Sequence, residues 1–312
     1  MSAILGIDTS NYTTSVAMID DAGKVLQAKK LLPVKEGEVG LRQSDAVFHH
    51  TQQLPEMIEE LFAQWDEIPC AIGVSTRPRN VEGSYMPCFT VGSGLARSLA
   101  ATLKVPLFEF SHQQGHIAAA LYSCQREDLF HQKFLAFHVS GGTTEALLVT
   151  PDAQETFCVQ MVAGSLDLKA GQAIDRVGHL LGLPFPAGKY LDALAQECKK
   201  PRKGHAVLKD GNCCLSGIEN QCQKLLEQGV EPATVARFCI DSVKWALDGM
   251  TEYLLEQYGT LPLVYAGGVM SNRIIREEFT KKYGANFAAP EFSTDNAAGI
   301  AVLTRRKLLG VQ

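Results

Sequence analysis

The chain has 312 residues, of which 46% are hydrophobic and 20% charged, a composition that supplies a packed core and excludes a disordered chain. At about 150 residues per domain, this length predicts two domains or one large two-lobed fold. Twenty-nine Lys and Arg against 34 Asp and Glu leave a net charge of −5, which argues against a protein that binds nucleic acid through an overall positive surface.

Strand-like runs alternate along the chain with runs of helical period, which is the pattern of an α/β fold. The predicted strands are 3–7, 15–19, 70–75, 105–110, 134–139, 145–150 and 263–266, and the predicted helices are 44–65, 92–104, 171–181, 232–258 and 271–283. Because no low-complexity linker separates these elements, we expect closely coupled lobes.

The cysteine pattern and the N-terminal sequence indicate in which cellular compartment the protein is expected. Nine cysteines are scattered without a C-x-x-C pair, which makes a zinc ribbon or a disulfide framework an unfavoured interpretation. The first residues, MSAILGIDTS, lack the pattern of a signal peptide, and no run approaches the roughly 18 apolar residues that span a bilayer. We expect a reduced, cytoplasmic protein without membrane contact.

An internal repeat relates two predicted hairpins. Residues 7–17, IDTSNYTTSVA, align at an offset of 130 with residues 137–147, FHVSGGTTEAL. Each segment predicts a strand, a turn of small hydroxyl residues and a second strand. Either hairpin alone is an ordinary turn, since Gly, Ser and Thr are common there. Their repetition favours two related lobes that face each other and direct N–H groups and hydroxyls toward a phosphate chain.

A third glycine turn follows the predicted strand 263–266. Gly267 and Gly268 permit close approach of the backbone to a ligand, Ser271 is expected to cap the next helix, and the helix N-terminus attracts anions. The same pattern also occurs in plain packing. A ligand-binding role for this turn is favoured because two similar turns precede it in the chain.

His112 and His116 are the candidate metal ligands. Their i, i+4 spacing puts both imidazoles on one helical face, and Asp295, at the start of the last helix, is the candidate third ligand. The alternatives are a half-exposed face for the histidines and a helix N-cap for Asp295.

Six motifs in fixed order resemble one known family. They are I-D-T-S, H-x-x-x-H, V-S-G-G-T-T, A-I-D-R-V-G-H-L-L-G-L, A-G-G-V-M-S-N-R and S-T-D-N-A-A-G-I-A. The family is TsaD, the tRNA threonylcarbamoyladenosine synthase subunit once described as a sialoglycoprotein endopeptidase. The resemblance runs nearly end to end. It implies the duplicated two-lobed α/β fold of actin, sugar kinases and heat-shock ATPases (ASKHA), with an N-terminal lobe of residues 1–108 and 295–312 and a C-terminal lobe of residues 109–294.

The resemblance also implies ligands. One divalent metal ion, iron or zinc, is expected on His112, His116 and Asp295. An adenine nucleotide or acyl-adenylate is expected on His138, Val139, Ser140, Gly141, Gly142, Asp175, Gly188, Gly267, Gly268 and Asn272. Asp8, Ser10 and Thr143 are the expected catalytic residues. The carboxylate of Asp175 suits ribose hydroxyls, which agrees with its expected place in this set.

The sequence departs from the family pattern at several positions. Where the family reads E-T-S-C-D-E-T, residues 8–14 read D-T-S-N-Y-T-T, and Tyr12 and Thr13 replace two carboxylates. Where it reads S-G-G-H-T, residues 140–144 read S-G-G-T-T, so Thr143 replaces an imidazole. The G-P-G-L loop and the F-S-F-S-G-L-K segment are replaced by residues 77–83 and 213–219. These changes indicate a divergent paralogue with an altered acceptor side.

The expected function is a TsaD-type, metal-dependent threonylcarbamoyl or carbamoyl transferase that modifies an amine, with a tRNA adenosine as the first choice of acceptor. Arg77, Arg79 and the basic run 199–203 are candidate acceptor contacts, and a solvated loop is the alternative for that run. Two other functions stay open. One is a non-catalytic nucleotide- or metal-binding protein that pairs with a related accessory subunit or a second copy. The other is a small-molecule kinase with Asp8 as its base.

Overall fold

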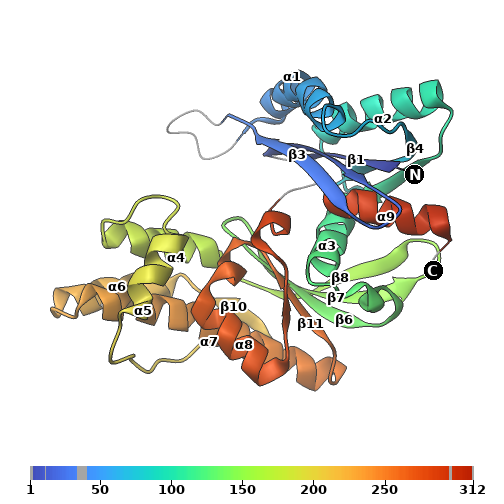
Figure 1. Ribbon diagram of the computed structural model, residues 1–312. Helices are drawn as coiled ribbons and strands as arrows, with labels where there is room; N and C mark the ends of the chain where they lie inside the picture. The colour runs from blue at the N-terminus through green and yellow to red at the C-terminus, as the bar shows by residue number, and fades with distance from the viewer. Residues whose placement is uncertain (1–2, 11, 34–40, 295–296, 311–312) are drawn as a thin grey trace. The chain divides into compact units, whose positions relative to one another are not determined.

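The computed structural model describes residues 3–10, 12–33, 41–294 and 297–310. The chain forms two compact units (Figure 1). Unit 1 comprises Met1–His131, Pro151–Val159 and Glu291–Gln312, and unit 2 comprises Gln132–Thr150 and Gln160–Pro290. This grouping assigns residues 109–131 to the N-terminal unit, whereas the expected lobe boundary lies at residue 108. Among the described residues, no helix is long and apolar enough to cross a membrane.

Unit 1 is built on a five-stranded sheet. Its strand order is β3 (Val25–Leu31), β2 (Thr13–Ile19), β1 (Ala3–Ser10), β4 (Pro69–Arg77) and β5 (Leu107–Ser111). Its α-helices are α1 (Gln43–Phe62), α2 (Phe89–Leu103), α3 (His112–Ser123) and α9 (Ala298–Leu309). Leu5 and Ile7 on β1 pack with Leu54 of α1 and Ala96 of α2 in one hydrophobic core. Since side chains alternate along a strand, Gly6 and Asp8 lie on the opposite face.

Two glycines explain why α3 belongs to unit 1. A Cβ atom added to Gly299 on α9 would lie 1.8 Å from the carbonyl oxygen of Gly115 on α3. Only a residue without a side chain permits this close approach of two helix backbones. The contact fixes the helix that carries His112 and His116 against α9.

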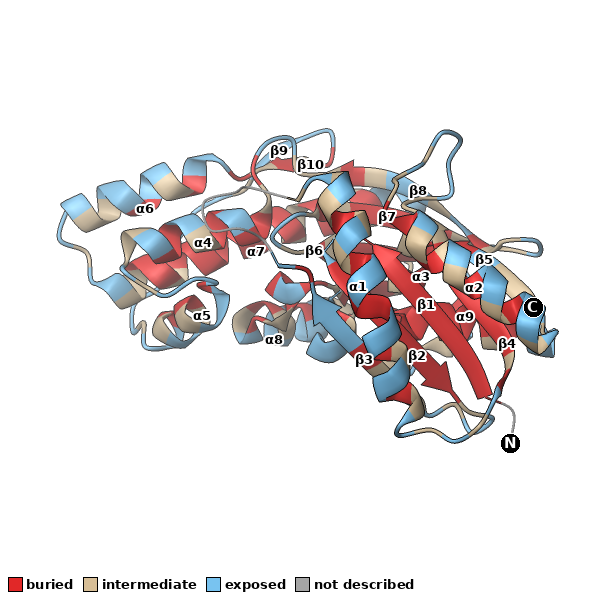
Figure 2. Ribbon diagram, turned by 90° about the horizontal axis from the view of Figure 1, so that it is seen from above, coloured by how far each residue is buried: buried red, intermediate tan, exposed pale blue. Residues whose placement is uncertain are grey.

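Unit 2 contains most of the second five-stranded sheet, although residues Pro151–Val159, from two of its strands, are grouped with unit 1. Its order is β12 (Asn286–Phe287), β11 (Leu263–Ala266), β6 (Phe134–Val139), β7 (Thr144–Asp152) and β8 (Thr156–Gly164). The remaining elements include a small hairpin, β9 (Val207–Lys209) and β10 (Asn212–Cys214), and the α-helices α4 (Ala170–Leu180), α5 (Gly188–Gln196), α6 (Gly217–Glu227), α7 (Pro232–Tyr258) and α8 (Arg273–Tyr283). The long α7 buries much of its surface in the core (Figure 2).

The two sheets have the same topology. Reading β1 as the counterpart of β6, β2 of β7, β3 of β8, β4 of β11 and β5 of β12 gives one strand order for both. The registers agree as well, because Thr9 pairs with Thr14 in one hairpin and Val139 with Thr144 in the other, again at an offset of 130. The structure therefore confirms the repeat that the sequence predicts.

All seven predicted strands and all five predicted helices are present, with ends that differ by a few residues. Among the strands and α-helices, the sequence analysis missed β3, β8, β9, β10, β12, α5 and α6. β3 contains a single buried residue, so its sequence shows no clear alternation. α5 is amphipathic but spans only nine residues, which is short for a helix to be identified from its period.

Candidate functional site

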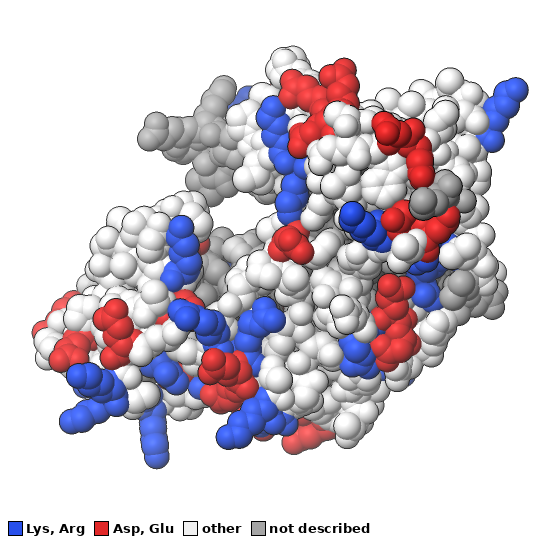
Figure 3. All heavy atoms as spheres, viewed as in Figure 1, with Lys and Arg blue, Asp and Glu red and all other residues white. Residues whose placement is uncertain are grey.

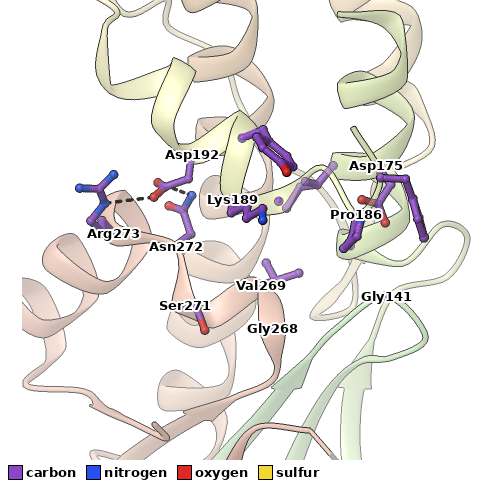
Figure 4. A pocket seen from close by; sticks show the side chains of 15 residues that line it. Gly141, Asp175, Pro186, Lys189, Asp192, Gly268, Val269, Ser271, Asn272 and Arg273 are labelled. Carbon is purple, nitrogen blue, oxygen red and sulfur yellow. Dashed lines mark hydrogen bonds and ion pairs between the residues drawn. The ribbon is translucent and has the colours of Figure 1, made fainter. Parts of the chain in front are cut away.

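A cavity of about 730 Å³ lies within unit 2 (Figure 4). Its walls come from the first turns of α4, α5 and α8 and from two glycine turns. Five of the residues expected to bind a nucleotide line it, namely Gly141, Asp175, Gly188, Gly268 and Asn272. These five come from four separate stretches of sequence, which the fold brings to one cavity.

The turn between β6 and β7 forms one wall of the cavity. The N–H of Ser140 donates to the carbonyl of Thr143 at 2.7 Å, and the N–H of Thr143 donates to Oγ of Ser140 at 3.1 Å. A Cβ atom added to Gly141 or Gly142 would meet no atom within 4 Å. The turn is therefore held by its own hydrogen bonds while its two glycines face open space.

Gly171 brings the start of α4 against this turn. Its N–H donates to the carbonyl of Ser140 at 3.1 Å, and an added Cβ would lie 2.7 Å from both Cα and N of Gly141. The preceding residue of α4 makes a second hydrogen bond to the same hairpin: the N–H of Ala170 donates to Oγ1 of Thr144 at 2.9 Å. The hydroxyl and the glycine together fix the N-terminus of α4 at the cavity.

Gly267 has a packing role. Its φ of +102° suits glycine, and an added Cβ would lie 2.2 Å from the carbonyl oxygen of Val139. Gly267 and Val139 thus join the ends of β11 and β6. Neither they nor His138, which lies on β6 opposite Glu145, is among the residues that line the cavity.

Asp175 lies on α4 and lines the cavity. One of its carboxylate oxygens, Oδ1, accepts a hydrogen bond from the N–H of Ala187 at 2.8 Å. This contact ties the residue before α5 to α4. The carboxylate is half-buried, so a ligand in the cavity can still reach it.

Asn272 caps α8, and the expectation that Ser271 would do so is wrong. Oδ1 of Asn272 accepts from the N–H of Ile275 at 3.2 Å, which is the N-cap bond. Its amide nitrogen donates to Oδ1 of Asp192 at 2.8 Å, and Nε of Arg273 donates to Oδ2 of Asp192 at 3.1 Å (Figure 4). Both oxygens of one carboxylate on α5 thereby orient two cavity residues on α8.

In unit 1, a cluster of three polar side chains, Asp8, His112 and His116, lies at the end of β1. Asp8 is fully buried; its Oδ1 accepts from the N–H of Ser10 at 2.9 Å and its Oδ2 lies 2.6 Å from Nδ1 of His112. The rings of His112 and His116 are 4.3 Å apart, centroid to centroid. The predicted common face of the two histidines is therefore present, and a buried carboxylate orients one of them.

Two buried hydroxyls lie on the same face of the sheet as Asp8. Ser10 is two residues along β1, and Ser75 lies on β4, one residue after the Val74 that pairs with Ile7. Both Oγ atoms are buried without a hydrogen-bond partner in the part of the chain that the structure describes. Thr143, the third expected catalytic residue, lies at the turn in unit 2 and is half-buried.

The residues around Asp8 fit a transition-metal ion. An imidazole that donates from Nδ1 to a carboxylate presents Nε2 to a metal, and this pairing is common in metal centres. The imidazoles of His112 and His116, together with the carboxylate expected from Asp295, would be a donor set that suits iron or zinc. Across residues 3–10, 12–33, 41–294 and 297–310, no three His, Cys, Asp or Glu side chains form a metal-binding group, and Asp295 lies outside these residues.

The sequence analysis missed three charged residues of the cavity, namely Lys189, Asp192 and Arg273. Asp192 lies four residues after Gly188, so the spacing would have put both on one face of a helix, but α5 was not predicted. Arg273 follows Asn272 directly in the quoted motif. Lys189 carries no sequence signal of its own.

The sequence comparisons identify the family. Residues 34–302 match TsaD, tRNA N6-adenosine threonylcarbamoyltransferase. The chain belongs to the TsaD family. It is 30% identical to the tRNA N6-adenosine threonylcarbamoyltransferase of Neorickettsia sennetsu (strain ATCC VR-367 / Miyayama) over 321 residues, which cover 96% of this chain and 91% of that relative.

Solved structures support the fold of this TsaD-family chain. Component A of the (R)-2-hydroxyglutaryl-CoA dehydratase of Acidaminococcus fermentans is 15% identical, with a TM-score of 0.58 over 99% of this chain and all (100%) of that one. HypF in its phosphate- and nucleotide-bound form is 15% identical, with a TM-score of 0.59 over 99% of this chain and 56% of that one. These similarities and the repeated strand order confirm the predicted ASKHA fold.

Proposed function

We propose that this protein transfers a threonylcarbamoyl group from an acyl-adenylate to the exocyclic amine of a tRNA adenosine. The observation that carries the proposal is the cavity of unit 2, because in a TsaD-family chain it gathers Gly141, Asp175, Gly188, Gly268 and Asn272. Its volume of about 730 Å³ lies within the range of small-molecule sites.

The cavity offers suitable chemistry for each part of an adenylate. Asp175 and Asn272 present a carboxylate and an amide to the hydroxyls and the base of a nucleoside. The open backbone around Gly141 and Gly142 suits a phosphate, which accepts hydrogen bonds from N–H groups. Thr143 belongs to the same turn but does not line the cavity, and we propose that its hydroxyl donates to the acyl group.

The proposed reaction is an acyl transfer without a covalent enzyme intermediate. The amine nitrogen of the adenosine attacks the carbamoyl carbonyl carbon, and the bond from that carbon to the phosphate oxygen breaks. AMP leaves and the amine loses one proton to solvent. The protein contributes by holding the adenylate in position and by donating hydrogen bonds to oxygens on which charge develops.

His112, His116 and Asp295 would hold the divalent metal ion, which when bound stabilises negative charge on oxygen as a Lewis acid. Asp8 is then a positioning residue, because its carboxylate contacts His112 and the Ser10 N–H. These two bonds also weigh against the kinase alternative, in which Asp8 would need to accept a proton from a substrate.

Because the chain has a net charge of −5, an RNA acceptor would have to be bound by a local group of basic side chains and not by an overall positive surface. On the face drawn in Figure 3, positive and negative side chains are interspersed. The basic run that contains Lys199, Lys200, Arg202 and Lys203 is exposed and follows α5, whose first turn lines the cavity. We therefore propose this run as an RNA contact.

In unit 1, Arg77 donates to Oδ1 of Asn80 at 2.6 Å and is held at the end of β4. A related accessory subunit or a second copy of the chain is a further proposed partner.

Deletion of the gene and quantification of threonylcarbamoyladenosine in bulk tRNA tests the proposal. We expect the modified nucleoside to fall, and to return when the wild-type gene is restored but not when Asp175→Asn is supplied. An unchanged level in the deletion strain would remove the tRNA role and leave another amine as acceptor. Metal analysis of the purified protein and of His116→Ala tests the metal site. Stoichiometric metal in the wild type and its loss from His116→Ala would support it, whereas no stoichiometric metal in either protein would remove the site and favour a non-catalytic partner subunit.

A further inference from the structure

The loop between β4 and α2 combines arginines with an exposed aromatic ring. Residues 77–79 read R-P-R where the family pattern has G-P-G, and Tyr85 follows in the same loop. Tyr85 is 67% exposed, and in the described part of the chain its ring has no hydrogen-bonded or aromatic partner. RNA-binding surfaces combine these two residue types, because arginine binds phosphate and an aromatic ring stacks on a base.

Hydrogen bonds to neutral groups hold the Arg77 guanidinium in place. Nη1 donates to Oγ1 of Thr76 at 3.0 Å, while Nε and Nη2 donate to Oδ1 of Asn80 at 3.2 Å and 2.6 Å. Nδ2 of Asn80 donates in turn to the Glu155 carboxylate at 2.9 Å, which fixes the amide with its oxygen toward Arg77. Among the described residues, no carboxylate forms an ion pair with Arg77. One hydrogen on each terminal nitrogen is left for an oxyanion, and the side chain is already ordered to receive it.

The loop is fixed beside the start of α3. The N–H of Gln113 donates to the carbonyl of Pro78 at 3.0 Å, and Arg77 pairs with Ser111 in the register of β4 and β5. Ser111 caps α3 and directly precedes His112, a proposed metal ligand. A molecule bound by this loop would therefore lie next to the proposed metal site of unit 1.

We propose that residues 77–85 form an RNA-binding loop, in which Arg77 binds a backbone phosphate and Tyr85 stacks on an unpaired base. The combination favours RNA over a small anion, because a free phosphate or carboxylate offers no base to the ring. The acceptor adenosine lies beside the anticodon, in a single-stranded loop whose bases are available for stacking. This inference rests on the proposed function, because that function supplies the RNA.

Binding of an unmodified tRNA transcript to the full chain tests the loop, measured by fluorescence anisotropy at several salt concentrations. Arg77→Met removes one phosphate contact, so the slope of log affinity against log salt should become shallower by about 1, whereas Arg77→Lys should keep the slope. Tyr85→Ala should weaken binding about tenfold at an unchanged slope, and Tyr85→Phe should bind like the wild type. Arg97→Met changes an exposed arginine of α2 outside the loop and should also bind like the wild type.

The opposite change is available in the same loop. Glu82 is exposed and carries the negative charge that partly offsets the two arginines. Glu82→Gln removes this charge, so we expect the transcript to bind about twofold more tightly, which would support the loop as the contact. Weaker binding of Glu82→Gln would contradict it.

Three further results would overturn the inference: a wild type that does not bind the transcript, wild-type affinity and slope in Arg77→Met or Tyr85→Ala, or an equal change of slope in Arg97→Met. The modified nucleoside in the deletion strain is scored separately. If it depends on the gene while the loop variants bind the transcript like the wild type, the RNA-binding loop fails and the proposed function stands. If the loop variants lose transcript binding while the deletion leaves the modified nucleoside unchanged, the proposed function fails and the RNA-binding loop stands.

Discussion

Oδ2 of Asp8 lies 2.6 Å from Nδ1 of His112, although 104 residues separate them in the sequence. Asp8 is at the end of β1 and His112 begins α3, which follows β5 of the same sheet. The carboxylate is fully buried, whereas the imidazole side chain is 18% exposed. A buried carboxylate thus fixes the orientation of a partly accessible imidazole, which we propose as a metal ligand.

Asp8→Asn should lower metal affinity without removing a proposed ligand. The amide keeps the size of the carboxylate but withdraws the charge that raises the basicity of His112, so we expect a loss of about 10- to 100-fold. Titration of zinc into the metal-free protein measures it. Asp20→Asn, at the end of β2, is the control and should bind like the wild type. Unchanged zinc affinity in Asp8→Asn would show that this carboxylate does not support a metal site.

Gly171→Ala should destabilise unit 2 and weaken nucleotide binding together. The new Cβ would lie 2.7 Å from backbone atoms of Gly141, so α4 or the β6–β7 turn has to shift. We expect a loss of about 2 kcal/mol in the free energy of unfolding, measured by urea denaturation.

The matched control for Gly171 is Gly217→Ala, in the first turn of α6. There the nearest atom to an added Cβ, Nε2 of Gln221, is 3.6 Å away, and we expect no loss of stability. Similar unfolding midpoints for the two variants would contradict the packing argument.

The sequence was sufficient for the features that local chemistry determines. The hairpin repeat at an offset of 130 predicted the duplicated sheets, and the His112–His116 spacing predicted one helical face. It could not reveal that Asp192 orients Asn272, since 80 residues separate the two and α5 has only two buried residues. It also could not show that Gly267 packs on Val139 while Gly268 lines the cavity, because adjacent glycines differ only in their tertiary surroundings.

Asp192→Ala should lower nucleotide affinity with little effect on folding. Its side chain is 13% exposed and orients the Asn272 amide and the Arg273 guanidinium. Its removal frees the guanidinium and leaves the amide held only by the N-cap bond from the N–H of Ile275. We expect AMP to bind about tenfold more weakly, at a stability cost of about 1 kcal/mol. Glu256→Ala, an exposed change on α7, serves as the control. AMP affinity within about twofold of the wild type would contradict this role.

His50, on α1, should make stability depend on pH. The side chain is fully buried, Thr14 Oγ1 lies 2.8 Å from its Nδ1 and donates to Gln53, and Nε2 has no partner among the described residues. Burial lowers the pKa of His50 from 6.5 to about 4, against the opposing charge of Asp8. The folded protein therefore binds fewer protons than the unfolded chain between these values. The contribution is complete above pH 6.5 and is lost as the pH falls toward 4.

The total contribution of His50 is about 3 kcal/mol across this window. We expect His50→Gln to be less stable than the wild type at pH 7.5, with a difference that shrinks as the pH falls to 4.5, because the amide does not titrate. Urea denaturation at each pH gives the two curves, and carboxylates that titrate in both proteins cancel in the difference. His179→Gln, on the exposed face of α4, should run parallel to the wild type. If the difference for His50→Gln is constant with pH, protonation of His50 does not limit stability in acid.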